Sequence, residues 1–260
     1  MAENASRIRS NLEWQAWGLK DPLFGVIPAT GREHEGSSPW TDETFYATGE
    51  TDWREFLDRW RKYGLDKSSC LEIGCGTGRL THSIAGDFLT VYGVDVSEGM
   101  IARARRHVGE NVQLFVTDGV TLPLPDQSIA AVFSFIVFLH FDSSEHAMAY
   151  FREIARVLKP GGTIMIQLPL HSWPMNVKPI ARSLFSSLYT GYMALRRVKA
   201  AYHRFRLAHD NWSPFMQSNS YQEDWVRSTL NVLGFEQIET CSFKLKRAGS
   251  FYSWLFARKV

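Results

Sequence analysis

Cysteine is scarce in this 260-residue sequence, and its few thiols lack the spacing of a metal site. Cys70, Cys75 and Cys241 are odd in number, and no two of them form a Cys-x-x-Cys pair. An odd set without such pairs favours reduced thiols over a disulfide framework or a zinc site. We therefore expect a protein of a reducing compartment, and the cytoplasm is the predicted location.

Long apolar runs and a strong net charge are missing as well. The first residues lack the apolar core of a signal peptide, and no run approaches the roughly 20 apolar residues of a membrane span. The formal net charge is only +2, so no nucleic-acid partner is predicted from charge. The chain contains no internal repeat. Its composition, 45% hydrophobic and 22% charged, is typical of a globular protein with a full core.

Residues 71–80 change abruptly from an apolar run to a glycine-rich turn. Gly74, Gly76 and Gly78 alternate with other residues before a helix-compatible segment follows, which predicts a strand, a tight loop and a helix start. Such a loop can bring backbone N–H groups close to a small polar ligand. A dinucleotide fingerprint would have its third glycine at position 79, which is Arg79. The spacing therefore disfavours a dinucleotide, and an ordinary glycine turn is the remaining structural alternative.

Beyond this loop, short apolar segments alternate with amphipathic ones. Strands are predicted at 90–96, 112–117, 129–136 and 163–169. The alternation predicts an α/β fold with a doubly wound parallel sheet, whose ligands bind at the carboxyl ends of the strands. Asp95 lies about 20 residues beyond the loop, where such folds have a ribose-binding carboxylate, although a helix-start acid is the alternative. Asp118 ends the next strand, with a simple Asp-Gly turn as its alternative.

The region before the loop has two parts. Residues 11–50 combine scattered aromatic side chains with turn formers, which predicts an irregular arm that either packs on the core or covers the ligand as a lid. After Thr51, a plausible N-cap, apolar residues recur at helical spacing until Gly64. We expect this amphipathic helix to cover one face or edge of the sheet.

Taken together, these segments resemble the class I S-adenosylmethionine-dependent methyltransferases, in particular the type 11-like group that acts on small molecules. The matching segments are 72–78, Asp95, 118–119, 122–126, 134–140 and 159–162. The resemblance implies a Rossmann-like sheet of seven strands, mostly parallel with an antiparallel last strand. It also implies S-adenosylmethionine as cofactor, S-adenosylhomocysteine as product, and no metal.

The same resemblance divides the chain into four segments. These are an N-terminal arm and helix at 1–65, a cofactor-binding core at 66–170, a helical insertion at 171–219, and a last helix with an edge hairpin at 220–260. The insertion is where this family commonly builds its acceptor pocket. Its aromatic residues either line that pocket or pack the insertion onto the sheet.

The resemblance also implies site residues. For the cofactor they are Tyr46, Glu72, Gly74, Cys75, Gly76, Asp95, Val96, Met100, Asp118, Gly119 and Phe135. A hydroxyl acceptor usually needs a general base, and His140, just beyond the fourth strand, is the predicted one. His171, after the fifth strand, is the second candidate. The alternative for His140 is a helix-start histidine bonded to the backbone.

The acceptor is not specified by any motif. We expect O-methylation of a small-molecule or lipid-linked acceptor, ahead of N- or C-methylation of a natural product. A non-catalytic S-adenosylmethionine-binding subunit and a dinucleotide-dependent oxidoreductase are the rival hypotheses. The protein is expected to be a monomer or a homodimer.

Residues 180–207 concentrate positive charge on an amphipathic pattern. Apolar residues recur at steps of three and four, while six arginines and lysines occur with no acid before Asp210. The apolar side either packs on the core or a second subunit, with the basic residues solvated, or the segment contacts an anionic membrane. The second reading predicts a peripheral membrane association.

Overall fold

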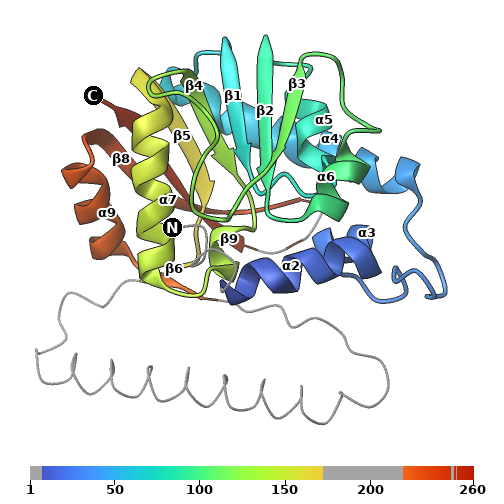
Figure 1. The fold of residues 1–260 in the computed structure, drawn as a ribbon. Helices are drawn as coiled ribbons and strands as arrows, with labels where there is room; N and C mark the ends of the chain where they lie inside the picture. The colour runs from blue at the N-terminus through green and yellow to red at the C-terminus, as the bar shows by residue number, and fades with distance from the viewer. Residues whose placement is uncertain (1–7, 172–218, 247–248, 250) are drawn as a thin grey trace, which may run out of the picture.

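The computed structural model describes residues 8–171, 219–246, 249 and 251–260, and its centre is a seven-stranded sheet (Figure 1). The strands are β1 Ser69–Ile73, β2 Thr90–Asp95, β3 Val112–Val116, β4 Ile129–Ser134, β5 Leu158–Gln167, β8 Phe235–Lys244 and β9 Phe251–Lys259. Their order in the sheet is β3-β2-β1-β4-β5-β9-β8. β9 is antiparallel to both β5 and β8, while the other pairs are parallel. This confirms the predicted doubly wound, mostly parallel sheet with an antiparallel last strand.

Helices cover both faces of this sheet (Figure 1). α4 Asp42–Trp60 and α5 Arg79–Ile84 pack on one face, and α7 Ser144–Val157 and α9 Glu223–Val232 pack on the other. α6 Glu98–Ala104 follows β2 and contacts β2 and β3. A separate two-stranded sheet pairs β6 Leu170–His171 with β7 Tyr221–Gln222.

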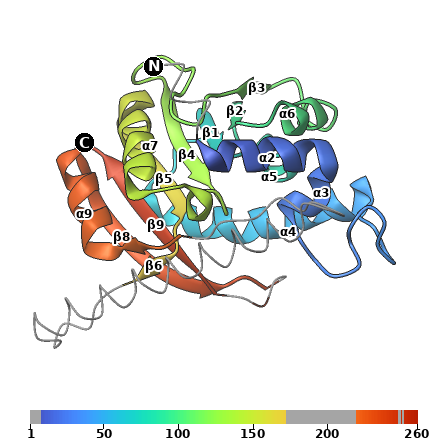
Figure 2. The same cartoon turned by 60° about the horizontal axis from the view of Figure 1, so that its bottom comes forward.

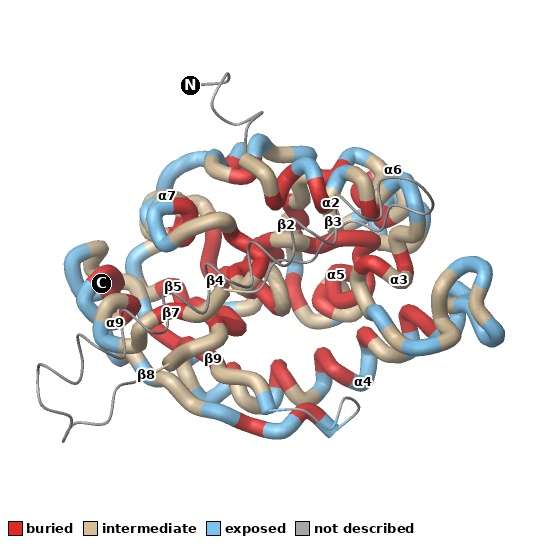
Figure 3. The backbone as a smooth tube through the Cα atoms, turned by 90° about the horizontal axis from the view of Figure 1, so that it is seen from below, coloured by how far each residue is buried: buried red, intermediate tan, exposed pale blue. Residues whose placement is uncertain are grey.

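The central strands bury both faces, because side chains alternate across a pleated sheet that is covered on both sides. On β4, Phe133 packs with α4 in one apolar cluster, while Val132 packs with α7 in the other. On β9, Trp254 and Leu255 divide between the same two clusters. Figure 3 shows the result, with buried residues along the strands and on the inner sides of the helices.

The N-terminal region is more regular than the sequence predicts. Instead of an irregular arm at 11–50, the structure has α2 Arg9–Lys20 and α3 Pro22–Val26. α4 also begins nine residues before the predicted cap, at Asp42 rather than after Thr51, because Thr41 and Thr44 form a capping box there. α2 and α3 lie together beside α4 and the loops of the sheet (Figure 2).

Ser143 accepts the N-cap hydrogen bond of α7, from the backbone N–H of His146. β5 begins directly after α7 and before the strand predicted at 163–169, so residues 159–162 lie inside the strand range, at an irregularity in its pairing with β4.

The insertion predicted at 171–219 lies outside the described residues except for its two ends, and so does the amphipathic segment at 180–207. Within the part of the chain that the structure describes, no helix combines the length and the apolar character needed to cross a membrane.

Candidate active site

The candidate site lies where the direction of the sheet reverses. From β1 the chain continues outward to β2 and β3, and it then returns to β4 on the other side of β1. Ligands of open α/β sheets bind at this point, beyond the carboxyl ends of the strands. The glycine loop follows β1, and the His140 segment follows β4. The Ser134 hydroxyl joins the two ends by donating a hydrogen bond to the Ile73 carbonyl, at 3.0 Å.

The glycine loop makes a close turn that other residues would obstruct. Gly74 has a φ of +72°, and a Cβ there would lie 2.2 Å from the Val137 side chain. Gly76 has a φ of +53°, and its N–H donates to Asp95 Oδ2 at 2.9 Å. The N–H of Gly74 is bonded to the Val94 carbonyl at the end of β2. The loop is therefore fixed to the next strand and leaves its backbone open toward the cavity.

Asp95 is held by the backbone on two sides. Besides the N–H of Gly76, its carboxylate accepts a hydrogen bond from the N–H of Ser97 at 2.9 Å. Burial raises the pKa of the Asp95 carboxyl, although the backbone N–H groups around it act in the opposite direction. An ionised carboxylate has about four acceptor positions, so Asp95 can accept further hydrogen bonds from a ligand in the cavity.

Glu72 lies under the loop, at the end of β1. Burial raises the pKa of its carboxyl to about 8, and the Thr81 hydroxyl, which donates to Glu72 Oε2 at 2.5 Å, partly opposes this effect. Nearby Arg79 lowers this pKa and Asp95 raises it. A buried carboxyl with a perturbed pKa beside a cavity is a common mark of a functional site.

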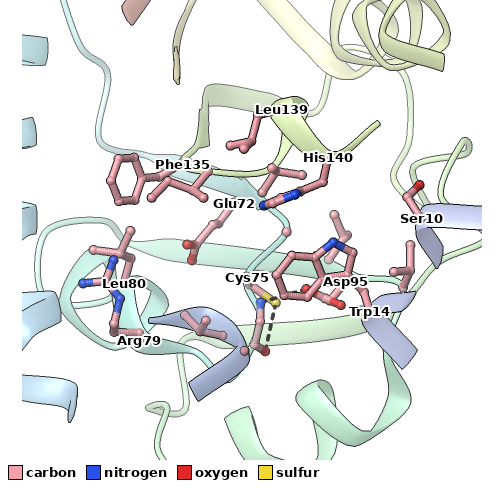
Figure 4. Close-up of a pocket in the computed structure, with 18 of the residues that line it drawn as sticks. Ser10, Trp14, Glu72, Cys75, Arg79, Leu80, Asp95, Phe135, Leu139 and His140 are labelled. Carbon is pink, nitrogen blue, oxygen red and sulfur yellow. Dashed lines mark hydrogen bonds between the residues drawn. The ribbon is translucent and has the colours of Figure 1, made fainter. Parts of the chain in front are cut away.

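These groups surround a cavity of about 480 Å³. In Figure 4 the side chains of Trp14, Glu72, Asp95 and His140 converge on one space. Eight of the predicted site residues line it, namely Glu72, Gly74, Cys75, Gly76, Asp95, Val96, Phe135 and His140. The sequence therefore identifies two of the loops that line the cavity.

His140 lies at the end of the short helix η2 Phe138–His140. Its ring meets the Trp14 ring edge to face, with centroids 4.9 Å apart. His140 is 6% exposed and lines the cavity opposite the glycine loop. A ring nitrogen here can exchange a proton with a group bound in the cavity.

The remaining predicted residues do not line this cavity. Tyr46 lies behind the glycine loop, where its hydroxyl donates to the Thr77 carbonyl at 2.7 Å. Met100 is buried on α6. Asp118 Oδ1 accepts hydrogen bonds from the backbone of Val120 and Thr121 in its own turn.

Gly119 and His171 do not line the cavity either. The Gly119 carbonyl is bonded to the ring of His146, and a Cβ on Gly119 would meet the Asn11 side chain. His171 belongs to the small sheet of β6 and β7, where burial lowers the pKa of its imidazole. The roles predicted for these residues therefore stay predictions.

The N-terminal helices provide one wall of the cavity, in the region where the sequence left a lid as one of two alternatives without identifying its residues. Ser10, Asn11 and Trp14 contribute from α2, and residues 25–28 contribute from the end of α3 and the segment after it. The sequence shows their aromatic and turn-forming character, but no spacing rule connects them to the glycine loop, which lies tens of residues further along the chain. Tyr150 and Tyr252 line the cavity from α7 and β9 and had no signal of their own.

Comparisons with known proteins agree with this geometry. Residues 71–166 match the family model described as a methyltransferase domain. A probable tRNA methyltransferase 9B of Homo sapiens is 27% identical over 234 residues, which are 80% of this chain and 49% of that protein. A demethylmenaquinone methyltransferase of Corynebacterium kroppenstedtii is 36% identical over 124 residues, 47% of this chain and 48% of that protein. The chain spans less than half the length of these curated relatives.

Among solved structures, magnesium protoporphyrin IX methyltransferase from Synechocystis PCC 6803, with bound SAH, has a TM-score of 0.59 at 16% identity, covering 96% of this chain and 100% of that one. At this identity the likeness concerns the fold alone. The sheet order, the glycine loop and the methyltransferase-domain match on residues 71–166 support the resemblance to class I S-adenosylmethionine-dependent methyltransferases that the sequence predicts.

Proposed function

We propose that this protein transfers the methyl group of S-adenosylmethionine to a hydroxyl of a small-molecule or lipid-linked acceptor, with His140 as the general base. The observation that carries the proposal is that His140 and the glycine loop line opposite sides of one cavity. S-adenosylmethionine supplies an electrophilic methyl group, so the protein must mainly align the acceptor with it and remove the acceptor's proton.

The residues of the cavity fit this cofactor. Glycines at 74 and 76 line the cavity without side chains, so a ligand can approach the backbone there. The Asp95 carboxylate is oriented by two N–H groups and suits the paired hydroxyls of a ribose. Glu72 lies beneath the loop, and a cationic part of the cofactor beside its carboxyl would lower the raised pKa and favour the ionised form.

His140 would act on the acceptor and not on the cofactor. Its imidazole would accept the proton of the acceptor hydroxyl as the new carbon–oxygen bond forms and the methyl–sulfur bond breaks, with S-adenosylhomocysteine as the leaving group. Water would later take that proton. The Trp14 ring beside it restricts water and offers an apolar contact for the acceptor. A neutral amine acceptor would depend much less on such a base.

An acceptor panel with detection of S-adenosylhomocysteine tests the proposal. The panel contains hydroxyl compounds, lipid-linked glycans, amines and tRNA, the last because of the relative named above. We expect turnover on a hydroxyl acceptor, and His140→Ala should lower it about 100-fold or more while cofactor affinity stays within about twofold. His34→Ala, at an exposed histidine outside the cavity, is the control.

Other outcomes would favour the alternatives. Turnover on amines that does not depend on His140 would indicate N-methylation. Tight cofactor binding with no turnover on any member of the panel would favour a non-catalytic binding subunit, because fold and cofactor site alone do not establish catalysis.

A further inference from the structure

The loop after β4 contains a backbone conformation that is unfavourable for its residue. Ile136 has a φ of +57°, in the left-handed region that β-branched residues rarely adopt. It lines the cavity four residues before His140. Such a conformation persists only where surrounding groups hold it, and these positions gather at active sites.

Hydrogen bonds from outside the loop hold it at four places. The Ile136 N–H donates to the Gln167 side-chain carbonyl at 3.2 Å. The Tyr221 hydroxyl donates to the Phe138 carbonyl at 2.5 Å. The backbone N–H of Asn219 donates to the Leu139 carbonyl at 2.6 Å, and the side-chain amide of the same residue donates to the Phe141 carbonyl. Both residues that flank His140 are therefore bonded to Asn219.

Tyr221 is itself firmly placed. Tyr221 is 4% exposed, belongs to β7, and has its N–H bonded to the Pro169 carbonyl at 2.8 Å. Its ring stacks on Trp225 of α9, with centroids 5.9 Å apart and planes 17° apart. Burial raises the pKa of the Tyr221 phenol, so the hydroxyl remains a donor at neutral pH.

We propose that Asn219 and Tyr221 are positioning residues that set the place of the His140 imidazole. The inference rests on the proposed function, because it gives His140 a role toward the acceptor. Neither residue lines the cavity, so each acts through the main chain of residues 138–141 and not through contact with a ligand. Loss of one anchor lets the strained loop relax, and a displacement of about 1 Å at a catalytic group can cost up to about 100-fold in rate.

Tyr221→Phe is the direct test, because it removes only the hydroxyl. We expect turnover to fall about tenfold or more while the dissociation constant of S-adenosylmethionine stays within about twofold. The His140 imidazole NMR resonance, assigned by its loss in His140→Gln, should shift. Asn219→Ala should shift the same resonance, and it provides the measurement if Tyr221→Phe does not fold.

Tyr46→Phe is the matched control. Tyr46 is also a buried tyrosine that donates to a main-chain carbonyl of a cavity loop, but that carbonyl belongs to Thr77 of the glycine loop. This variant should raise the dissociation constant of the cofactor and leave the His140 resonance in place. If each tyrosine holds its own loop, Tyr221→Phe changes the His140 resonance and not the cofactor affinity, whereas Tyr46→Phe changes the cofactor affinity and not the resonance.

The outcomes separate the two proposals. If the wild-type protein methylates no acceptor, the proposed function fails, while the His140 resonance in Tyr221→Phe still decides whether the loop is held as we infer. If Tyr221→Phe and Asn219→Ala fold with an unchanged His140 resonance and unchanged turnover, the positioning role is wrong. If Tyr46→Phe shifts the His140 resonance by the same amount, the shift reflects a general loosening of the protein and not the loss of a specific anchor. The positioning role would then also be wrong.

Discussion

Asp95 combines two tasks in one carboxylate. It orders the glycine loop through the N–H of Gly76, and we propose that it also accepts hydrogen bonds from the cofactor. Asp95→Ala should weaken S-adenosylmethionine binding by about 1.5 to 3 kcal/mol, because hydrogen bonds to a charged group are lost. Isothermal titration calorimetry measures this change. Asp66→Ala is a control, since Asp66 also accepts a hydrogen bond from the N–H two residues on, but far from the cavity. Equal affinity in a folded Asp95→Ala protein would contradict the ribose assignment.

The raised pKa of Glu72 predicts a dependence of stability on pH. Because the pKa of about 8 lies above the unfolded value near 4.3, the folded protein keeps a proton that the unfolded chain has released between these values. The free energy of unfolding should therefore fall as pH rises from about 5 to 8. In Glu72→Gln, which resembles the protonated acid, this part of the slope should disappear. Urea denaturation at several pH values tests it, and parallel curves for the two proteins would refute it.

At single positions, the sequence could predict the loops of the site but not the direction of every side chain. Asp95 and Tyr46 were both assigned to the cofactor, and the structure has them on opposite sides of the glycine loop. The spacing of the glycines specifies where the backbone turns. It does not specify which side chains pack behind the turn. Those side chains come from an N-terminal helix whose position on the sheet is decided by tertiary packing.

At the scale of elements, α2 shows why part of the N-terminal region was not predictable. Its N-cap residue is Ile8, which has no side-chain acceptor. The cap instead comes from Asp142, whose Oδ2 accepts from the N–H of Arg9 at 2.8 Å and from that of Ser10 at 3.4 Å. The sequence signals that mark the start of a helix lie within a few residues of it, whereas this acceptor lies 133 residues away. The start of α2 could therefore not be predicted from them.

This distant cap leads to a prediction about α2 as a cover of the cavity. Asp142→Ala should destabilise the first turn of α2 by about 0.5 to 2 kcal/mol, as the loss of an N-cap does. Since Ser10, Asn11 and Trp14 line the cavity, cofactor dissociation should become faster. Hydrogen exchange of α2 and stopped-flow dissociation measure both effects. Asp126→Ala, which removes an exposed aspartate paired with Arg156, should change neither. Unaltered exchange in α2 would show that Asp142 does not hold the helix.

At the scale of the whole molecule, the fold was predictable because its signals repeat along the chain. β1, β2 and β4 are each followed by a helix, and the central strands bury both faces as apolar runs, so errors of a few residues at the ends do not change the topology. α4 covers one face of the sheet, as its amphipathic pattern predicts. Its Trp53, Phe56 and Trp60 lie in the apolar cluster on that face, so the helix is part of the core.

α4 is also joined to the core by a buried ion pair. Arg79 Nη1 lies 2.7 Å from Asp52 Oδ2, and the two side chains are 5% and 0% exposed. Arg79 also lines the cavity, so the pair connects α4, α5 and the site. Breaking a buried pair from one side leaves a charge without compensation, which costs far more than losing a pair on the surface.

Asp52→Ala should therefore lower the free energy of unfolding by about 3 to 5 kcal/mol. Asp58→Ala, which removes the exposed partner of Arg61 on the same helix, should cost no more than about 1 kcal/mol. In the double variant Asp52→Ala, Arg79→Met, an apolar side chain replaces the unpaired guanidinium, so part of the lost stability should return. Urea denaturation of the wild type, Asp52→Ala, Arg79→Met and the double variant gives the coupling energy between the two residues. If the double variant is less stable than Asp52→Ala by the full cost of a separate Arg79→Met substitution, the two residues act independently, and the ion pair does not join α4 to the core.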